Sequence, residues 1–153
     1  MNVFTSMKKM FVACMMLVAS MNMMASTVAE VVAAGAQDKA STSGTVVATY
    51  ARGFLISDGT GYILTYLGSD SGLAIGDVVT VSGTTSMYGG LLQFASGSTF
   101  EKTGTAEVTQ PEPEVLDGAA LDAYLDAPSI KYVQYTGTLN ISGYYYNVNV
   151  DGA

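Results

Sequence analysis

The 153-residue chain contains no histidine, no tryptophan and only one cysteine, Cys14. Histidine is the commonest general base and, together with cysteine, the usual ligand for zinc and copper. With a single cysteine near the N-terminus, the body of the chain has no thiolate nucleophile and no internal disulfide. These absences exclude serine–histidine and cysteine–histidine catalysis. We therefore predict a non-enzymatic protein with no catalytic residue, no cofactor and no metal site.

Basic side chains are also scarce, because six Lys and Arg stand against thirteen Asp and Glu and give a net charge of −7. All thirteen acids follow residue 29, whereas two of the six bases precede it. The chain after residue 29 therefore has four bases against thirteen acids, a net charge of −9. Nucleic-acid binders neutralise phosphates with a basic groove, which this composition does not supply.

The first 29 residues have the pattern of a secretory signal peptide. Lys8 and Lys9 precede the short apolar run MFVACMMLVAS, and small residues follow it. The run is shorter than the roughly 20 residues of a membrane span, so we predict none. Thr27 and Ala29 are small residues at the two positions that a signal peptidase recognises, which predicts cleavage before Glu30.

Lipidation of Cys14 is the alternative interpretation of this segment. Only four residues separate Cys14 from Lys9, fewer than the roughly 7 to 15 apolar residues expected in a signal peptide. A hydrophobic cysteine inside a removed peptide is the simpler interpretation. We expect a secreted, periplasmic or cell-surface protein.

Beyond the signal peptide, composition divides the chain into four parts. Residues 30–43 are small and polar and predict a flexible tether. Residues 44–110 contain five β-branched and aromatic runs with Gly-rich turns and no long helix, which predicts an all-β domain. Residues 111–128 are a Pro-Glu linker followed by a short helix, with Asp117 as its N-cap and Pro128 as its end. Residues 129–153 are again strand-like.

This last segment resembles the start of the first domain. GTVVATYARGFLISDGT and GTLNISGYYYNVNVDGA align at an offset of 93 residues, so we predict the first strand of an incomplete second unit. The alignment places Phe54 opposite Asn147 and Leu55 opposite Val148. A one-residue slip exchanges the two faces of a strand, so either a bulge differs between the copies or Leu55 is the core residue. The incomplete unit would leave an open strand edge for a protein partner.

Four segments of residues 44–110 carry a family resemblance: GFLISDGTGYILTY, IGDVVTVSGT, YGGLLQF and FEKTG. They resemble the secreted OB-fold modules of bacterial extracellular nucleases and Bacteroides-type surface proteins. The resemblance implies a small five-stranded barrel that binds an oligomer across strands 2 and 3. It also implies single-stranded nucleic acid as a partner, by family analogy alone. Only MYGG joins strands 3 and 4, where many OB folds carry a helix, so the expected fold is OB-like.

The candidate binding face lies on the second predicted strand, residues 62–68. Tyr62, Leu64 and Tyr66 share one face, and if Ile63 and Leu67 face the core the tyrosines point outward. Aromatic side chains on neighbouring strands would extend the platform, and a nearby arginine would add a cation. The predicted ligand-binding residues are Arg52, Tyr62, Tyr66, Tyr88 and Phe94.

The composition suits a glycan or other extracellular polymer better than a nucleic acid, because such a ligand needs aromatic faces but no cationic field. A structural or assembly spacer of a larger surface protein is the second hypothesis. The C-terminal NVNVDG matches the first half of a calcium loop, but valines separate its oxygen ligands and the closing glutamate is missing. Strand and turn formation explains it better.

Overall fold

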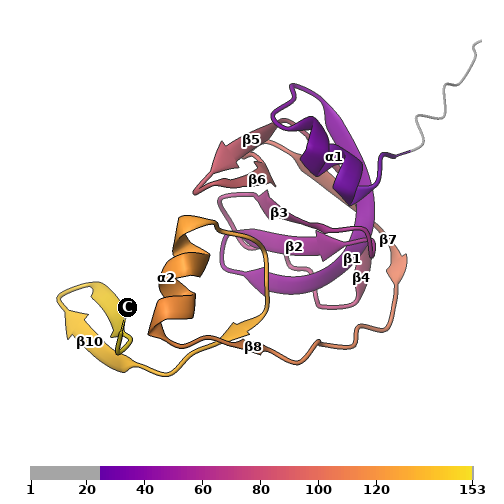
Figure 1. The fold of residues 1–153 in the computed structure, drawn as a ribbon. Coiled ribbons are helices and arrows are strands. Elements are labelled where there is room, and N and C mark those ends of the chain that lie inside the picture. The colour runs from indigo at the N-terminus through magenta and orange to yellow at the C-terminus, as the bar shows by residue number, and fades with distance from the viewer. Residues whose placement is uncertain (1–24, 153) are drawn as a thin grey trace, which may run out of the picture.

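The computed structural model describes residues 25–152 (Figure 1), so most of the predicted signal peptide lies outside the described residues. None of the helices within this range is long and apolar enough to cross a membrane. The elements, in chain order, are α1 Val28–Ala34, β1 Ala40–Tyr50, β2 Gly53–Ser57, β3 Tyr62–Tyr66, β4 Asp77–Gly83, β5 Thr85–Tyr88, β6 Leu91–Phe94, β7 Thr99–Thr105, β8 Glu114–Val115, α2 Gly118–Asp126, β9 Val133–Gln134, β10 Thr138–Ser142 and β11 Tyr145–Asn149.

The main body is one seven-stranded mixed sheet in the order β5–β6–β3–β2–β1–β4–β7. Among the neighbouring strands of this sheet, only β3 and β6 run parallel to each other. The predicted all-β class is confirmed, but the five-stranded closed barrel is not found, because the sheet order has two ends, β5 and β7. Two of the five predicted β runs, residues 45–57 and 77–88, are divided: a turn at Ala51 and Arg52 separates β1 from β2, and Thr84 separates β4 from β5.

The core lies on one face of this curved sheet and follows the two-residue alternation of its strands. In β2, Phe54 and Ile56 are fully buried while Leu55 between them is not. The ring of Phe54 packs edge-to-face on Phe100, with 5.2 Å between ring centroids. The other core side chains are Val28, Val31, Val46, Ile63, Val79, Val81, Leu92 and Phe94.

Helix α1 covers this core, so the predicted tether over residues 30–43 is wrong: these residues form most of α1 and the start of β1. Thr27 begins the helix with a capping box to Glu30. Val28 and Val31, three residues apart, lie on one helix face and are buried. The cleavage site predicted before Glu30 therefore falls inside an ordered helix.

The DGTG turn after β2 holds the N-terminus of α1. The Asp58 carboxylate accepts a hydrogen bond from the Val28 amide at 2.9 Å, and the Thr60 hydroxyl oxygen accepts one from the Ala29 amide at 3.1 Å. The same carboxylate accepts hydrogen bonds from the amide and hydroxyl of Thr60. A turn that connects two strands thus also satisfies helix amides that have no partner within the helix.

The linker contains helix α2, which begins after Asp117. The Asp117 carboxylate accepts a hydrogen bond from the Ala120 amide at 2.8 Å, and the helix ends before Pro128. Short parallel strands β8 and β9 flank this helix. Figure 1 shows the linker running below the main sheet toward a hairpin, β10–β11, at the C-terminal end.

The segment predicted as a single strand of a second unit is this hairpin, and it repeats the hairpin β1–β2. Both close through two-residue turns: Tyr50 pairs with Gly53 in the first, and Ser142 with Tyr145 in the second. The first hairpin has one extra residue, because the pairing skips Val47, whereas the second pairs without interruption. A bulge present in one copy only is thus the correct alternative.

The bulge changes which residues correspond in the second strand of each hairpin. The offset is 93 residues before the bulge and 92 after it, so Ile56 corresponds to Val148. Two glycines agree with this register. A Cβ on Gly44 would lie 2.9 Å from the carbonyl oxygen of Ser57, and a Cβ on Gly137 would lie 2.5 Å from that of Asn149.

Candidate functional site

The face of the sheet opposite the core presents the predicted tyrosines. Along β3, Ile63 and Thr65 are buried, so Tyr62, Leu64 and Tyr66 point away from the core. Leu64 has Leu55 of β2 and Gln93 of β6 as its cross-strand neighbours. This face is therefore built from apolar and aromatic side chains with an amide at one side.

Part of this face is an open hollow of about 400 Å³, which we call the tyrosine hollow. This volume lies within the range of about 300 to 1,000 Å³ that is common for ligand pockets. The side chains that form it come from β1, the β1–β2 turn, β3, β5 and β6, and they are Tyr50, Arg52, Leu64, Tyr66, Tyr88 and Gln93.

A glycine makes room for two of these tyrosines. Gly53 lies between Tyr50 and Tyr66 in the register of the three strands. A Cβ at Gly53 would overlap the carbonyl oxygen of Thr65 and would lie 2.9 Å from the hydroxyl of Tyr50. That hydroxyl donates a long hydrogen bond, 3.4 Å, to the same carbonyl. Because no side chain fits at position 53, the backbone there stays open between the rings.

The tyrosine hollow contains side chains that can donate hydrogen bonds to a ligand. Burial, and secondarily the neighbouring Tyr66, raise the pKa of Tyr50, so this phenol stays protonated at neutral pH. Lys102 and Lys131 form salt bridges with Asp77 and Glu114, at 2.6 and 2.9 Å. Within residues 25–152, Arg52 forms no salt bridge, which leaves its guanidinium free to bind a ligand.

The structure brings together three of the five predicted ligand-binding residues: Arg52, Tyr66 and Tyr88. Phe94 was wrongly assigned to the platform, because it is fully buried in the core. Tyr62 is on the correct face but lines a different pocket.

The other three side chains of the tyrosine hollow are Tyr50, Leu64 and Gln93. Sequence reasoning placed Leu64 on the same face as Tyr66 without assigning it to the site, and it missed Tyr50 and Gln93. Alternation along β6 could have identified Gln93, since a buried Phe94 requires its neighbour to face outward. Tyr50 could not be placed in the same way, because its orientation depends on the unrecognised turn after it.

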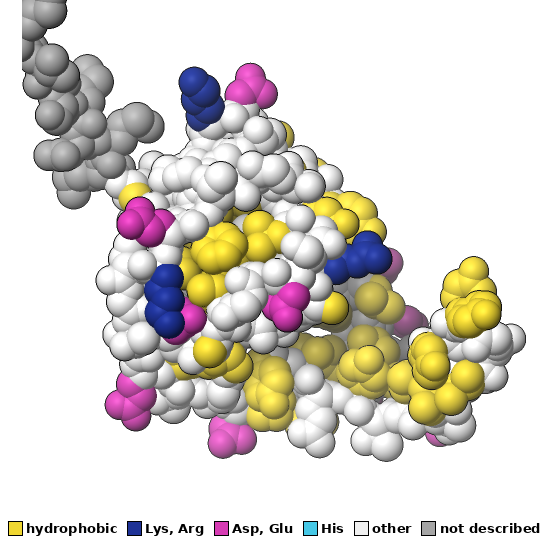
Figure 2. All heavy atoms as spheres, turned by 180° about the vertical axis from the view of Figure 1, so that it is seen from behind, with side chains coloured by type: hydrophobic (Ala, Val, Ile, Leu, Met, Phe, Trp, Pro, Cys, Tyr) yellow, Lys and Arg dark blue, Asp and Glu magenta, His cyan; other side chains and the backbone are white. Residues whose placement is uncertain are grey.

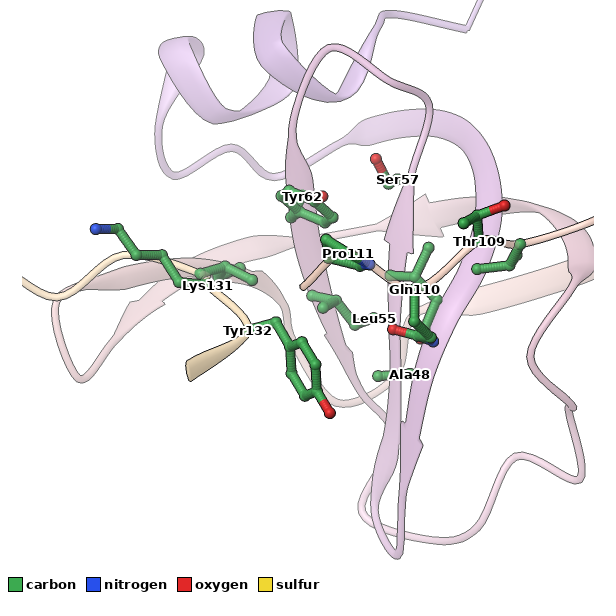
Figure 3. A pocket seen from close by; sticks show the side chains of 12 residues that line it. Ala48, Leu55, Ser57, Tyr62, Thr109, Gln110, Pro111, Lys131 and Tyr132 are labelled. Carbon is green, nitrogen blue, oxygen red and sulfur yellow. The ribbon is translucent and has the colours of Figure 1, made fainter. Parts of the chain in front are cut away.

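Tyr62 lines a pocket of about 210 Å³ between the sheet and the linker, here named the linker pocket. Figure 3 shows the linker residues Gln110 and Pro111 beside Leu55, with Tyr62 and Tyr132 around them. The side-chain amide of Gln110 donates a hydrogen bond to the carbonyl of Val47 at 3.2 Å. The linker pocket contains only one of the five predicted ligand-binding residues, Tyr62, whereas the tyrosine hollow contains three, so the tyrosine hollow is the stronger candidate.

Neither pocket is lined by a cluster of metal-ligating side chains. Within residues 25–152, no group of three or more His, Cys, Asp or Glu side chains is placed to hold a metal ion. Comparison of the chain with protein-family models, with curated proteins and with solved structures finds no match.

Proposed function

We propose that this protein is a secreted, non-enzymatic binding module that takes an extracellular glycan in the tyrosine hollow. The observation that carries the proposal is the convergence of three tyrosines, Gln93 and Arg52 on one open surface. Aromatic rings provide apolar faces for the C–H faces of sugars, and their hydroxyls provide hydrogen bonds. The amide and guanidinium groups add donors for sugar hydroxyls and carboxylates.

We further infer that the main body is OB-like. Three features support this inference: β1 pairs with both β2 and β4, β3 runs parallel to β6, and only Thr84 interrupts the chain between β4 and β5. If β4 and β5 act as one bent strand, these pairings follow the circuit of an OB barrel. Two of the six side chains of the tyrosine hollow, Leu64 and Tyr66, then lie on the third strand of that circuit, near the surface that the fold uses for oligomers.

Single-stranded nucleic acid is the weaker candidate ligand. Of the six side chains in the tyrosine hollow, only Arg52 is basic. Tyrosine stacking would suit bases, but a bound strand also needs cationic side chains along its phosphates. A glycan needs no such field, so its binding should change little between low and high salt.

A binding screen of the full chain tests the proposal. Neutral and uronate-bearing polysaccharides, single-stranded DNA and RNA are presented at two salt concentrations, and affinities are measured by calorimetry or affinity electrophoresis. Tyr66→Ala and Tyr88→Ala should each weaken glycan binding by roughly tenfold or more, because burial of an aromatic ring contributes about 1.5 to 3 kcal/mol.

Tyr62→Ala is the matched control, since Tyr62 is on the same strand and face as Tyr66 but outside the tyrosine hollow. It should leave glycan binding within about twofold of the unmodified chain. Equal losses in Tyr62→Ala and Tyr66→Ala, or no binding to any polysaccharide, would reject the tyrosine hollow as a glycan site. Binding to single-stranded DNA or RNA that falls steeply with salt would identify the nucleic-acid alternative instead.

A further inference from the structure

The linker pocket is lined by three separate parts of the chain. Strands β1, β2 and β3 contribute its sheet side, and residues 108–111 of the linker and residues 130–132, which follow α2, contribute the rest. Ligand pockets commonly occur in such a position, where one folded unit meets another segment. The half-buried aliphatic side chains that line the pocket are Val47, Leu55, Val108 and Ile130.

The bulge in β1 turns two consecutive residues toward this pocket. Successive side chains of an uninterrupted strand point to opposite faces, yet Val47 and Ala48 both line the pocket. The pairing of β1 with β2 passes from Val46 to Ala48, so Val47 is the extra residue. The carbonyl of Val47 accepts the hydrogen bond from the Gln110 side chain at 3.2 Å. The bulge therefore shapes the pocket and also provides the acceptor that holds the linker beside it.

The second hairpin shows that a hairpin of this kind forms without the bulge. Strands β10 and β11 pair without interruption and close through the same two-residue turn. The extra residue of the first hairpin therefore has another cause. Bulges are frequent next to functional sites, where they redirect a side chain, and the linker pocket is the site that this bulge lines.

The charges around the linker pocket favour a neutral ligand. Lys131 is the one charged residue among those that line it, and its ammonium group forms a salt bridge with Glu114 at 2.9 Å. A charged ligand would lose its water at this apolar surface without gaining a free partner, which is costly. A neutral molecule avoids that cost.

The size and the rings of the pocket favour a small aromatic ligand. Its volume is about 210 Å³, and a cavity of about 150 Å³ lined by aliphatic and aromatic side chains is large enough to bind benzene. The pocket therefore has room for one ring or two fused rings. Tyr62 and Tyr132 lie around the aliphatic side chains (Figure 3), and aromatic rings attract one another in offset and edge-to-face arrangements.

We propose that the linker pocket binds a small, neutral aromatic molecule, and that the bound ring holds the linker against the sheet. The ring would contact Ala48 and Leu55 on the sheet side and Val108 and Ile130 on the other side at the same time. Binding and docking of the linker therefore favour each other. This proposal does not depend on the function of the tyrosine hollow.

Titration of the full chain with indole, followed by the NMR shifts of its amides, tests the proposal. Indole should produce saturable shift changes at the residues that line the linker pocket. It should also slow hydrogen exchange of the amides in residues 108–110 and 130–132. Benzoate and benzylamine add a negative or a positive charge to a similar ring, and each should bind roughly tenfold or more weakly than indole.

Ala48→Leu should weaken indole binding by roughly tenfold or more, because the added side chain occupies the space of the ring. Thr49→Leu is the matched control, since it places the same side chain one residue further along β1, at an exposed position outside the pocket. It should leave the affinity within about twofold of the unmodified chain. Equal thermal unfolding of the two variants would show that the main body still folds.

Gln110→Ala tests whether docking of the linker contributes to binding. This variant loses the hydrogen bond to the Val47 carbonyl, so indole affinity should fall by roughly two- to tenfold. Glu112→Ala is the matched control, because Glu112 is also an exposed linker residue but does not line the pocket. It should bind indole like the unmodified chain.

The hairpin β10–β11 is a second place where an apolar probe could bind. Figure 2 shows hydrophobic side chains gathered on this projecting hairpin, and Leu139 and Ile141 are 57% and 58% exposed. Shift changes at the hairpin or at the tyrosine hollow, without changes at the linker pocket, would overturn the proposal. No saturable binding of indole, equal affinities of Ala48→Leu and Thr49→Leu, or charged rings that bind as tightly as indole would also overturn it. Unchanged indole affinity in Gln110→Ala would reject the coupling to the linker.

Discussion

The hydroxyl of Thr65 is the one buried side-chain oxygen or nitrogen of the described residues that has no hydrogen-bond partner. Thr65 is fully buried on the core side of β3, between the outward-facing Leu64 and Tyr66. A buried polar group without a partner costs about 1 to 3 kcal/mol, and valine has the same shape without the hydroxyl. Thr65→Val should therefore raise the free energy of unfolding by about 1 kcal/mol, measured by urea denaturation.

Thr85→Val is a control with the opposite expected sign. Thr85 is also buried, but its hydroxyl accepts a hydrogen bond from the Gln37 amide at 2.9 Å and donates one to the Gly35 carbonyl at 3.0 Å. Its loss should lower the free energy of unfolding by about 1 to 3 kcal/mol. If both variants change stability in the same direction, the hydroxyl of Thr65 has a partner in solution, such as a buried water molecule.

At the scale of elements, α1 links the N-terminal region to the folded sheet. Val28 is fully buried, Thr27 caps the helix, and the Val28 amide is bound by Asp58. A chain that begins at Glu30 lacks these contacts, whereas one that begins at Thr27 keeps them. We expect the shorter chain to lose roughly 3 kcal/mol of unfolding free energy, from one buried valine and one helix cap.

Urea denaturation of the two chains, compared by their midpoints, checks this expectation. Deleting residues 27–29 would leave the midpoint unchanged if they were an unstructured segment, and that result would contradict a structural role for α1. A large loss would show that a chain beginning at Thr27 suits the fold better than one beginning at Glu30.

The turns that divide elements were harder to predict than the strands themselves. Alternation was sufficient to orient Tyr62 and Tyr66, because a strand exposes every second residue. The turn at Ala51 and Arg52 carries none of the Asn-Gly or Asp-Gly pairs that mark short hairpins. The bulge at Val47 has no residue signature either, so only the paired backbone shows why the two copies align with a slip.

At the scale of the whole molecule, the pairings between strands that are distant in the chain could not be predicted from the sequence. The sequence predicts a β-rich body, but the neighbours of β7 and the parallel pair β3–β6 depend on contacts between residues distant in the chain. The tyrosine hollow has the same origin, since its side chains come from four strands and a turn. Alternation along β3 was enough to place Leu64 and Tyr66 on the outward face, whereas placing Tyr50 beside them required the folded structure.

The stability of the whole molecule should also depend on pH through two aspartates. Partial burial of the Asp58 carboxylate raises its pKa. Hydrogen bonds from Thr60 and from the Val28 amide have the larger combined effect, so the pKa of Asp58 lies below its ordinary value. The hydrogen bond from Lys102, together with one from the Ala74 amide, lowers the pKa of Asp77. Both carboxylates therefore bind protons less readily in the folded state than in the unfolded chain.

A lowered pKa in the folded state stabilises the protein above the unfolded pKa, which is about 3.9 for Asp. This stabilisation should be fully present at neutral pH and should disappear as the pH falls below about 4, through the folded pKa values. Unfolding free energies measured by urea denaturation from pH 7 to pH 2.5 should show this decline. Asp58→Asn should unfold more easily at pH 7 and show a shallower decline, because the charged acceptor at the start of α1 is gone. Parallel pH profiles for the variant and the unmodified chain would show that the Asp58 carboxylate does not contribute to acid sensitivity.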